Sequence, residues 1–239
     1  MKTKNILLYT ALCFCLTQGG FTQNAEPCWA KDDFAICTIS KGVFKVMEGK
    51  SYPAGTLIPK EDLRLLRIKY YGFDGEIKTG DMIVHKTVAG ELLDIFQELL
   101  AAEYPIEKIS LIDYYDADDM RSMTNNNTSA FYWRNITGGK SLSYHAVGLA
   151  VDINPLYNPY VKGNIVEPPS AAVYLDRTTP VKGLIANSQD AAVRAFKKRG
   201  WRWGGDWRTL KDYQHFEKHG NVYKKYKSKL AEISRETKP

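Results

Sequence analysis

The stretch Ser143-Tyr-His145-Ala-Val-Gly148-Leu-Ala-Val-Asp152-Ile-Asn-Pro155 decides how the rest of the chain is organised. Its second half alternates along the chain, as a β-strand with two unlike faces does. One face carries Leu149, Val151 and Ile153, and the other carries Ala150, Asp152 and Asn154. An acid on a buried strand is costly unless it binds a cation or accepts hydrogen bonds. The stretch therefore predicts a polar turn that runs into a strand with a functional carboxylate.

A second polar motif, Asp212-Tyr-Gln-His215-Phe-Glu217, follows much later in the chain. His145 lies seven residues before Asp152, and the flexible Gly148 between them allows imidazole and carboxylate to meet. With His215, the two motifs supply two histidines and one carboxylate, with a spare acid nearby. This is the ligand set of a catalytic zinc site.

The two motifs resemble those of the VanY-type D-alanyl-D-alanine carboxypeptidase family, zinc peptidases of the bacterial cell wall that also include L-alanyl-D-glutamate peptidases. The matching pattern is Ser143-x-His145-x-x-Gly148-x-Ala150-x-Asp152 followed by Asp212-x-x-His215. Flanking segments at 126–131 and 201–207 resemble one branch of the family. The resemblance implies one Zn²⁺ per chain, held by His145, Asp152 and His215, with Asp212 as the catalytic base.

Positive and hydroxyl side chains near these motifs are candidates for contacts with substrate. The family branch places an arginine shortly after its Asn-Asn-Thr-Ser-Ala-Phe run, which corresponds to Arg134 and implies a role in stabilising the oxyanion. Arg121 is the second candidate for that role, and the sequence does not separate the two. Ser143 lies two residues before a predicted zinc ligand, so we expect its hydroxyl to face the cleft and bind substrate.

Other residues offer alternative readings of the site. His215 and His219 are spaced as on one helix face, but Gly220 favours a strand that ends before His219. Asp206 and Glu217 are alternative bases, although Asp206 follows a Gly-Gly turn and Glu217 could orient a ligand histidine. Asp116, Asp118 and Asp119 lack the pattern of a calcium loop and predict a solvated loop. His85 at a strand end predicts a hydrogen-bonded structural residue.

The pattern along the chain predicts an α+β fold, a single compact domain with a small, mainly antiparallel sheet flanked by helices and the zinc cleft on the sheet. Strands are expected at 63–71, 82–84 and 109–114, a strand followed by a Gly-Gly turn at 201–207, and helices at 87–103, 189–199 and 222–236. Residues 125–129 predict a structured loop near the site. The proline-rich segment 156–187 predicts a long loop over the cleft.

The first residues predict export. Residues 1–25 have two lysines before a short apolar run and read as a secretory signal peptide rather than a membrane helix. The assigned domains are the signal peptide at 1–25, an N-terminal arm at 26–62 and a zinc peptidase domain at 63–239. After cleavage the net charge falls from +6 to +4, which gives no indication of nucleic-acid binding. Cys28 and Cys37 are then expected to form a disulfide.

The sequence therefore predicts a secreted or periplasmic zinc metallopeptidase, a monomer without membrane insertion, whose substrate is the peptidoglycan stem peptide. Release of C-terminal D-alanine is the favoured reaction. The alternatives are an L-alanyl-D-glutamate endopeptidase and a non-catalytic, zinc-stabilised module that binds the cell wall. An acid at position 212 favours an enzyme, because a binding module has no need of a base.

Overall fold

The larger sheet contains the two longest strands of the described chain. In the computed structural model, which describes residues 28–31, 33–136 and 141–236, β3 (Leu63–Tyr71) pairs antiparallel with β4 (Ile77–His85). The strand expected at 63–71 is confirmed, whereas the returning strand begins at Ile77, earlier than the expected 82–84. The link is consequently a tight turn around Gly75, whose φ of 86° lies in the left-handed region open to glycine.

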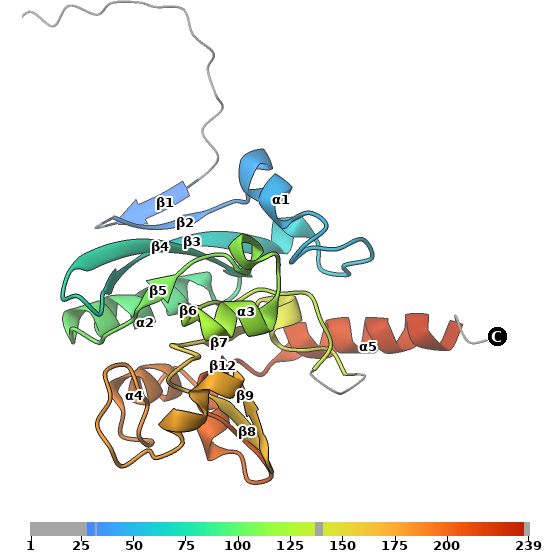
Figure 1. Cartoon of the computed structure of the whole chain (residues 1–239). Coiled ribbons are helices and arrows are strands. Elements are labelled where there is room, and N and C mark those ends of the chain that lie inside the picture. Colours follow the sequence, from blue (N-terminus) through green and yellow to red (C-terminus); the bar gives the residue numbers. More distant parts are fainter. Residues whose placement is uncertain (1–27, 32, 137–140, 237–239) are drawn as a thin grey trace, which may run out of the picture.

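The N-terminal arm extends this sheet. Its strands β1 (Cys28–Lys31) and β2 (Phe34–Cys37) give the order β1-β2-β3-β4 (Figure 1). Cys28 and Cys37 are cross-strand partners joined by the expected disulfide. The arm continues through helix α1 (Lys41–Met47) and a 3₁₀ turn, η1 (Lys60–Asp62). The predicted signal peptide, 1–25, lies outside the described residues, and the domain boundary at 63 stays a prediction.

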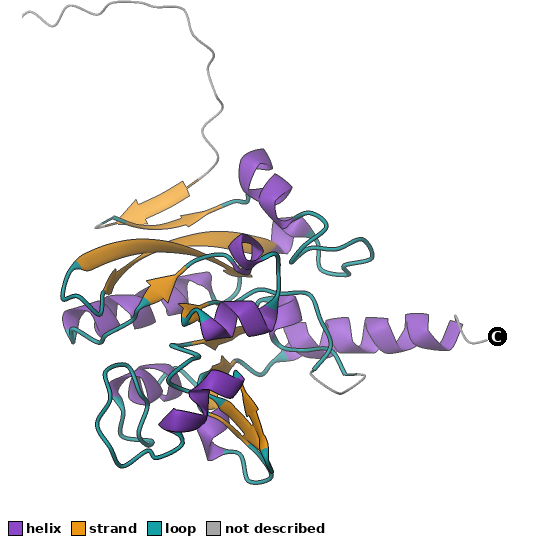
Figure 2. Cartoon of the chain, viewed as in Figure 1, coloured by secondary structure: helices purple, strands orange, loops and turns teal. Residues whose placement is uncertain are grey.

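Helix α2 (Ala89–Ala101) confirms the helix expected at 87–103 and covers one face of the larger sheet (Figures 1 and 2). Its buried stripe follows helical spacing and packs against β3 and against helix α4 (Ala191–Lys197). That stripe consists of Ala89, Leu92, Leu93, Ile95, Phe96 and Leu99. Helix α2 is thus enclosed on two sides, which accounts for its near-continuous apolar face.

The strand expected at 109–114 is wrong beyond its first residue. Only β5 (Lys108–Ile109) is extended, and a 3₁₀ turn, η2 (Ile112–Tyr115), follows. The physical reason is Asp113, a buried acid in the middle of the apolar run. Its carboxylate accepts hydrogen bonds from the backbone N–H and the hydroxyl of Ser51, both at 3.0 Å, and this contact turns the chain.

The solvated loop expected for the acidic cluster holds for Asp116 and Asp118, which are exposed between η2 and the next helix, whereas Asp119 begins that helix. Asp118 caps helix α3 (Asp119–Thr124) by accepting the N–H of Arg121, and Asp116 pairs with Lys50 at 3.0 Å. The next segment holds β6 (Asn127–Thr128), which runs parallel to β5. The loop expected at 125–129 is therefore a turn only at 125–126, and the rest of the segment is extended and reaches the site through a β-bridge between Ser129 and Asp152.

The third sheet carries the motif residues. Its order is β10-β12-β7, with β10 at Arg202–Trp203, β12 at His215–Glu217 and β7 at Ala150–Asp152. The strand and the Gly-Gly turn expected at 201–207 are confirmed, because β10 passes into a 3₁₀ turn, η5 (Gly204–Asp206). Before β7, the 3₁₀ turn η3 (His145–Val147) ends at Gly148.

Segment 156–187 is irregular only in part, because residues 175–187 contain no helix or strand whereas residues 160–174 are mostly regular. It forms β8 (Tyr160–Lys162), β9 (Ile165–Glu167) and the 3₁₀ helix η4 (Pro169–Tyr174). With β11 (Lys211–Asp212) it makes a sheet ordered β11-β8-β9, placed below β7 and β12 in Figure 1. The α+β class is thus confirmed, with the strands divided among several small, mainly antiparallel sheets.

Helix α5 (Asn221–Glu236) projects from the body at the C-terminal end, as expected for 222–236 (Figure 1). Its first turns are anchored by Tyr223 and Tyr226, which are buried against the core. Within the described ranges, none of the helices has the length and apolar character needed to cross a membrane.

Candidate active site

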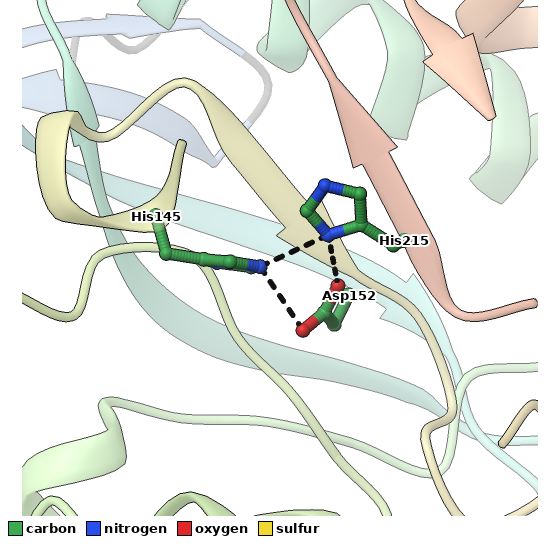
Figure 3. Close-up of side chains that lie close together, drawn as sticks. All are labelled: His145, Asp152 and His215. Carbon is green, nitrogen blue, oxygen red and sulfur yellow. Dashed lines mark hydrogen bonds and ion pairs between the residues drawn. The ribbon is translucent and has the colours of Figure 1, made fainter. Parts of the chain in front are cut away.

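The pairing of β7 with β12 brings the two sequence motifs together. Asp152 and His215 are direct cross-strand partners, so their side chains lie on one face of the sheet. His215 Nδ1 lies 3.0 Å from Asp152 Oδ1 and 3.1 Å from His145 Nε2. His145 Nε2 lies 3.1 Å from the other oxygen, Asp152 Oδ2 (Figure 3). Two motifs that are some 63 positions apart in sequence thus meet at one point.

His145 reaches this point because the turn before β7 is fixed by local contacts. Ser143 Oγ accepts the backbone N–H of His145, and His145 Nδ1 donates to the carbonyl of Ala130 at 2.6 Å. Gly148 has a φ of 66°, and a Cβ there would lie 2.5 Å from the backbone nitrogen of His85. Glycine is required at this position, as a bend and a close backbone approach coincide.

The geometry of the three donors fits a metal ion. Ligands about 2.1 Å from a tetrahedral zinc lie about 3.4 Å apart, close to the separations observed. The Nδ1 proton of His145 is held by Ala130, and His215 Nε2 lies 3.3 Å from the carboxylate of Glu217. Each histidine therefore presents its other ring nitrogen, Nε2 of His145 and Nδ1 of His215, to the cluster. Glu217 orients His215 as the sequence suggested.

The electrostatics of the cluster also favour a cation. Burial alone would raise the pKa of Asp152, but the adjacent His145 and His215 hold it well below its usual range. Burial alone would lower the pKa of His215, and hydrogen bonds to Asp152 and Glu217 overcome this and raise it to about 10. The attraction that holds a proton on His215 is equally available to a divalent cation.

A cleft of about 360 Å³ opens onto the three residues. Of the residues predicted for the site, it is lined by His145, Asp152, His215, Asp212, Arg134, Ser143 and Glu217. Arg121 is not in this lining and pairs with Asp116 at 2.8 Å on the exposed side of α3. Asp206 is also outside it and pairs with Lys197 at 2.6 Å.

Asp212 lies in an unusual environment for a carboxylate. Among the described residues its Oδ1 is enclosed without a hydrogen-bond partner. Burial raises the pKa of Asp212 to about 7, opposed by the positive charge of His215 and reinforced by Asp152. A carboxyl group whose pKa lies near neutrality can both accept and return a proton.

The same pKa predicts a stability effect. Since the folded-state pKa of about 7 lies above the ordinary value of 3.8, folding takes up a proton between these values. Stability therefore falls as pH rises through this window, and the loss is complete above pH 7. In metal-free protein, Asp212→Asn should increase the free energy of unfolding at pH 8 by about 1–2 kcal/mol and have little effect near pH 4. Urea unfolding at both pH values measures this, and equal effects would contradict it.

Arg134 and Ser143 both face the cleft but also hold local structure. Arg134 pairs with Asp119 at 2.9 Å, and both side chains line the cleft. The Ser143 hydroxyl, which we expected to contact substrate, also supports the turn at His145. Ser143 N–H donates to the carbonyl of Arg134, so the two residues are adjacent.

The remaining histidines lie outside the cluster. His219 is beyond the end of β12, lies 2.6 Å from Glu217 and stacks on Tyr144, so it does not form a pair with His215. His85 bonds to Thr87, and burial lowers its pKa to about 4, which fits the expected structural role.

Sequence reasoning did not find several residues of the cleft wall. Gln214 is buried, and its Oε1 has no partner within the described part of the chain. Tyr160 and Glu167 reach the cleft from β8 and β9. Trp207 lies in the lining, and its ring centroid is 5.4 Å from that of His215. Trp201 and Trp203 are core residues. Nothing in the sequence indicated the strand register that places Tyr160 and Glu167 in the cleft wall.

A buried two-histidine, one-carboxylate cluster at a cleft with a high-pKa acid is the arrangement of a metallopeptidase. Residues 137–218 match the family model described as D-alanyl-D-alanine carboxypeptidase, which confirms the resemblance over the segment that contains the whole cluster. Searches of curated proteins and of solved structures returned no match.

Proposed function

We propose that this protein is a zinc-dependent peptidase that hydrolyses stem peptides of the bacterial cell wall and releases C-terminal D-alanine. The observation that carries the proposal is the meeting of His145, Asp152 and His215 beside Asp212, at a cleft inside the family-matching segment. His145, Asp152 and His215 are the proposed zinc ligands, with one Zn²⁺ per chain.

Asp212 is the proposed general base. A zinc ion at the cluster would supply a Lewis acid that polarises the scissile carbonyl and acidifies water. Asp212 takes a proton from the attacking water and returns it to the departing amine. Enclosing a carboxylate oxygen without a hydrogen-bond partner lowers the stability of the folded protein. A protein that only binds would gain nothing in return, so this arrangement favours an enzyme over a zinc-stabilised binding module.

Arg134 is the proposed partner of negative charge in the substrate. It is the one lysine or arginine among the described residues that line the cleft. A guanidinium can hold a carboxylate through two parallel hydrogen bonds, and the neighbouring Ser143 hydroxyl can add a third. An anchor of this kind suits a peptidase that recognises a free C-terminus. It supports the carboxypeptidase reaction over internal cleavage.

The discriminating experiment compares a stem pentapeptide ending in D-alanyl-D-alanine with its C-terminal amide. The zinc-loaded protein should cleave the free acid at least about tenfold faster, because the amide cannot accept charge-assisted hydrogen bonds. Release of D-alanine is measured by mass spectrometry. Equal rates for the free acid and the amide, or cleavage at the L-alanyl-D-glutamate bond, would contradict the carboxypeptidase proposal and favour the endopeptidase.

The cellular setting follows from the substrate. Stem peptides lie outside the cytoplasm, so we propose a secreted or periplasmic location, in agreement with the signal peptide predicted at 1–25 and with a disulfide between Cys28 and Cys37. We further propose that the protein acts as a monomer, since the residues that make up the proposed site come from one chain.

A further inference from the structure

Three side chains form a row across the three-stranded sheet that borders the cleft. In the sheet β11-β8-β9, Asp212 is the cross-strand partner of Tyr160, and Tyr160 is the partner of Glu167. Direct partners in antiparallel strands point to the same face. All three indeed line the cleft. The row therefore leads from the proposed base to a second carboxylate.

Glu167 is the cleft acid whose charge the proposed reaction does not use. Asp119 pairs with Arg134, and Glu217 is engaged by His215 and His219. Asp152 belongs to the metal cluster and Asp212 is the base. Glu167 is half-buried, and no hydrogen bond or ion pair to its carboxylate is found among the described residues. A carboxylate held at a cleft wall without a partner is suited to a cation from the substrate.

The geometry points to a new substrate contact, which rests on the function proposed above: we propose that Glu167 binds the ammonium group of a basic side chain in the substrate peptide. That side chain belongs to the residue two positions before the residue that is released. Substrates with a diamino acid at this position would be preferred over those with a neutral side chain.

The position follows from the strand spacing. Neighbouring strands lie about 4.8 Å apart, so Glu167 is about 10 Å from Asp212 at the backbone. An extended peptide advances about 3.4 Å per residue, and a lysine side chain reaches outward by several more ångströms. With the C-terminal carboxylate at Arg134, such a side chain would pass over Tyr160. The Tyr160 ring can pack on its methylene groups and attract the cation.

The test uses three peptides that end in D-alanyl-D-alanine and differ only in the residue before this pair, which is lysine, norleucine or glutamate. For the zinc-loaded parent protein, KM should be about tenfold lower for the lysine peptide than for the norleucine peptide, with similar kcat. In Glu167→Gln this preference should disappear. Glu76→Gln, which removes the same charge at an exposed position outside the cleft lining, should retain it.

Binding to the zinc-loaded Asp212→Ala variant, measured by calorimetry, separates this inference from the reaction itself. Tighter binding of the lysine peptide supports the contact even if no peptide is hydrolysed by the parent protein. Hydrolysis of the lysine and norleucine peptides with equal KM overturns the contact and leaves the peptidase proposal standing. As a second variant, Glu167→Lys should reverse the order and bind the glutamate peptide best; an unchanged order would also overturn the inference.

Discussion

Replacement of Asp152 or His215 by alanine should reduce bound zinc from about one ion per chain to near zero. Each change removes one of three donors that lie 3.0–3.1 Å apart. Peptide hydrolysis should fall by about 10³-fold or more, because a metal Lewis acid contributes several kcal/mol to transition-state stabilisation. Metal analysis after gel filtration, together with D-alanine release, measures both effects.

His219→Ala provides the matched control for the metal prediction. This histidine follows the same strand and contacts Glu217, yet it lies outside the donor cluster. The variant should retain its zinc. Loss of the metal from His219→Ala, with full zinc in Asp152→Ala, would replace the proposed ligands by the His215–His219 pair.

Asp212→Ala should separate catalysis from metal binding. The variant is expected to keep its zinc, because Asp212 is not among the three clustered donors. Its activity should fall by roughly 10²- to 10⁴-fold, the usual contribution of a positioned general base. Rates on the stem pentapeptide, with zinc content measured on the same samples, provide the readout.

Asp206→Asn is the control for the base assignment. Asp206 is only a few residues away but lies outside the cleft and pairs with Lys197. Its variant should hydrolyse the pentapeptide at close to the parent rate. If Asp212→Ala is nearly as active as the parent, Asp212 has a structural role and Glu217 becomes the candidate base.

The parts of the site that could be predicted from the sequence are those fixed by local pattern. The alternation after Gly148 places Asp152 on a strand face, and the strand that carries His215 ends at Glu217, before His219, as Gly220 had indicated. Strand periodicity and turn chemistry indicated these positions, and the resemblance to the peptidase family indicated that they act together on one metal ion. Helix α2 was found for the same reason, since its apolar stripe has a helical period.

The parts that could not be predicted depend on contacts between distant segments. The place of Glu167 in the cleft is set by a strand register that joins β9 to β11 through β8, and a single sequence does not encode that register in any short motif. The strand predicted at 109–114 was wrong for a similar reason, because a contact between distant segments decides the local structure. Asp113 turns the chain through a bond to Ser51, 62 positions earlier in the chain.

The backbone contact at Gly148 has a consequence for how the segment with the candidate metal ligands can be inherited or transplanted. The His85 N–H donates to the Gly148 carbonyl at 2.8 Å, and β4 lies too close to Gly148 for any side chain there. The family-matching segment thus depends on a strand that precedes it by some fifty positions and lies outside the match. Residues 137–218 are therefore not expected to keep this local structure when they are moved alone into another protein. A graft into another scaffold would need to carry the end of β4 with it, and recombination between these segments would separate the motif from its support.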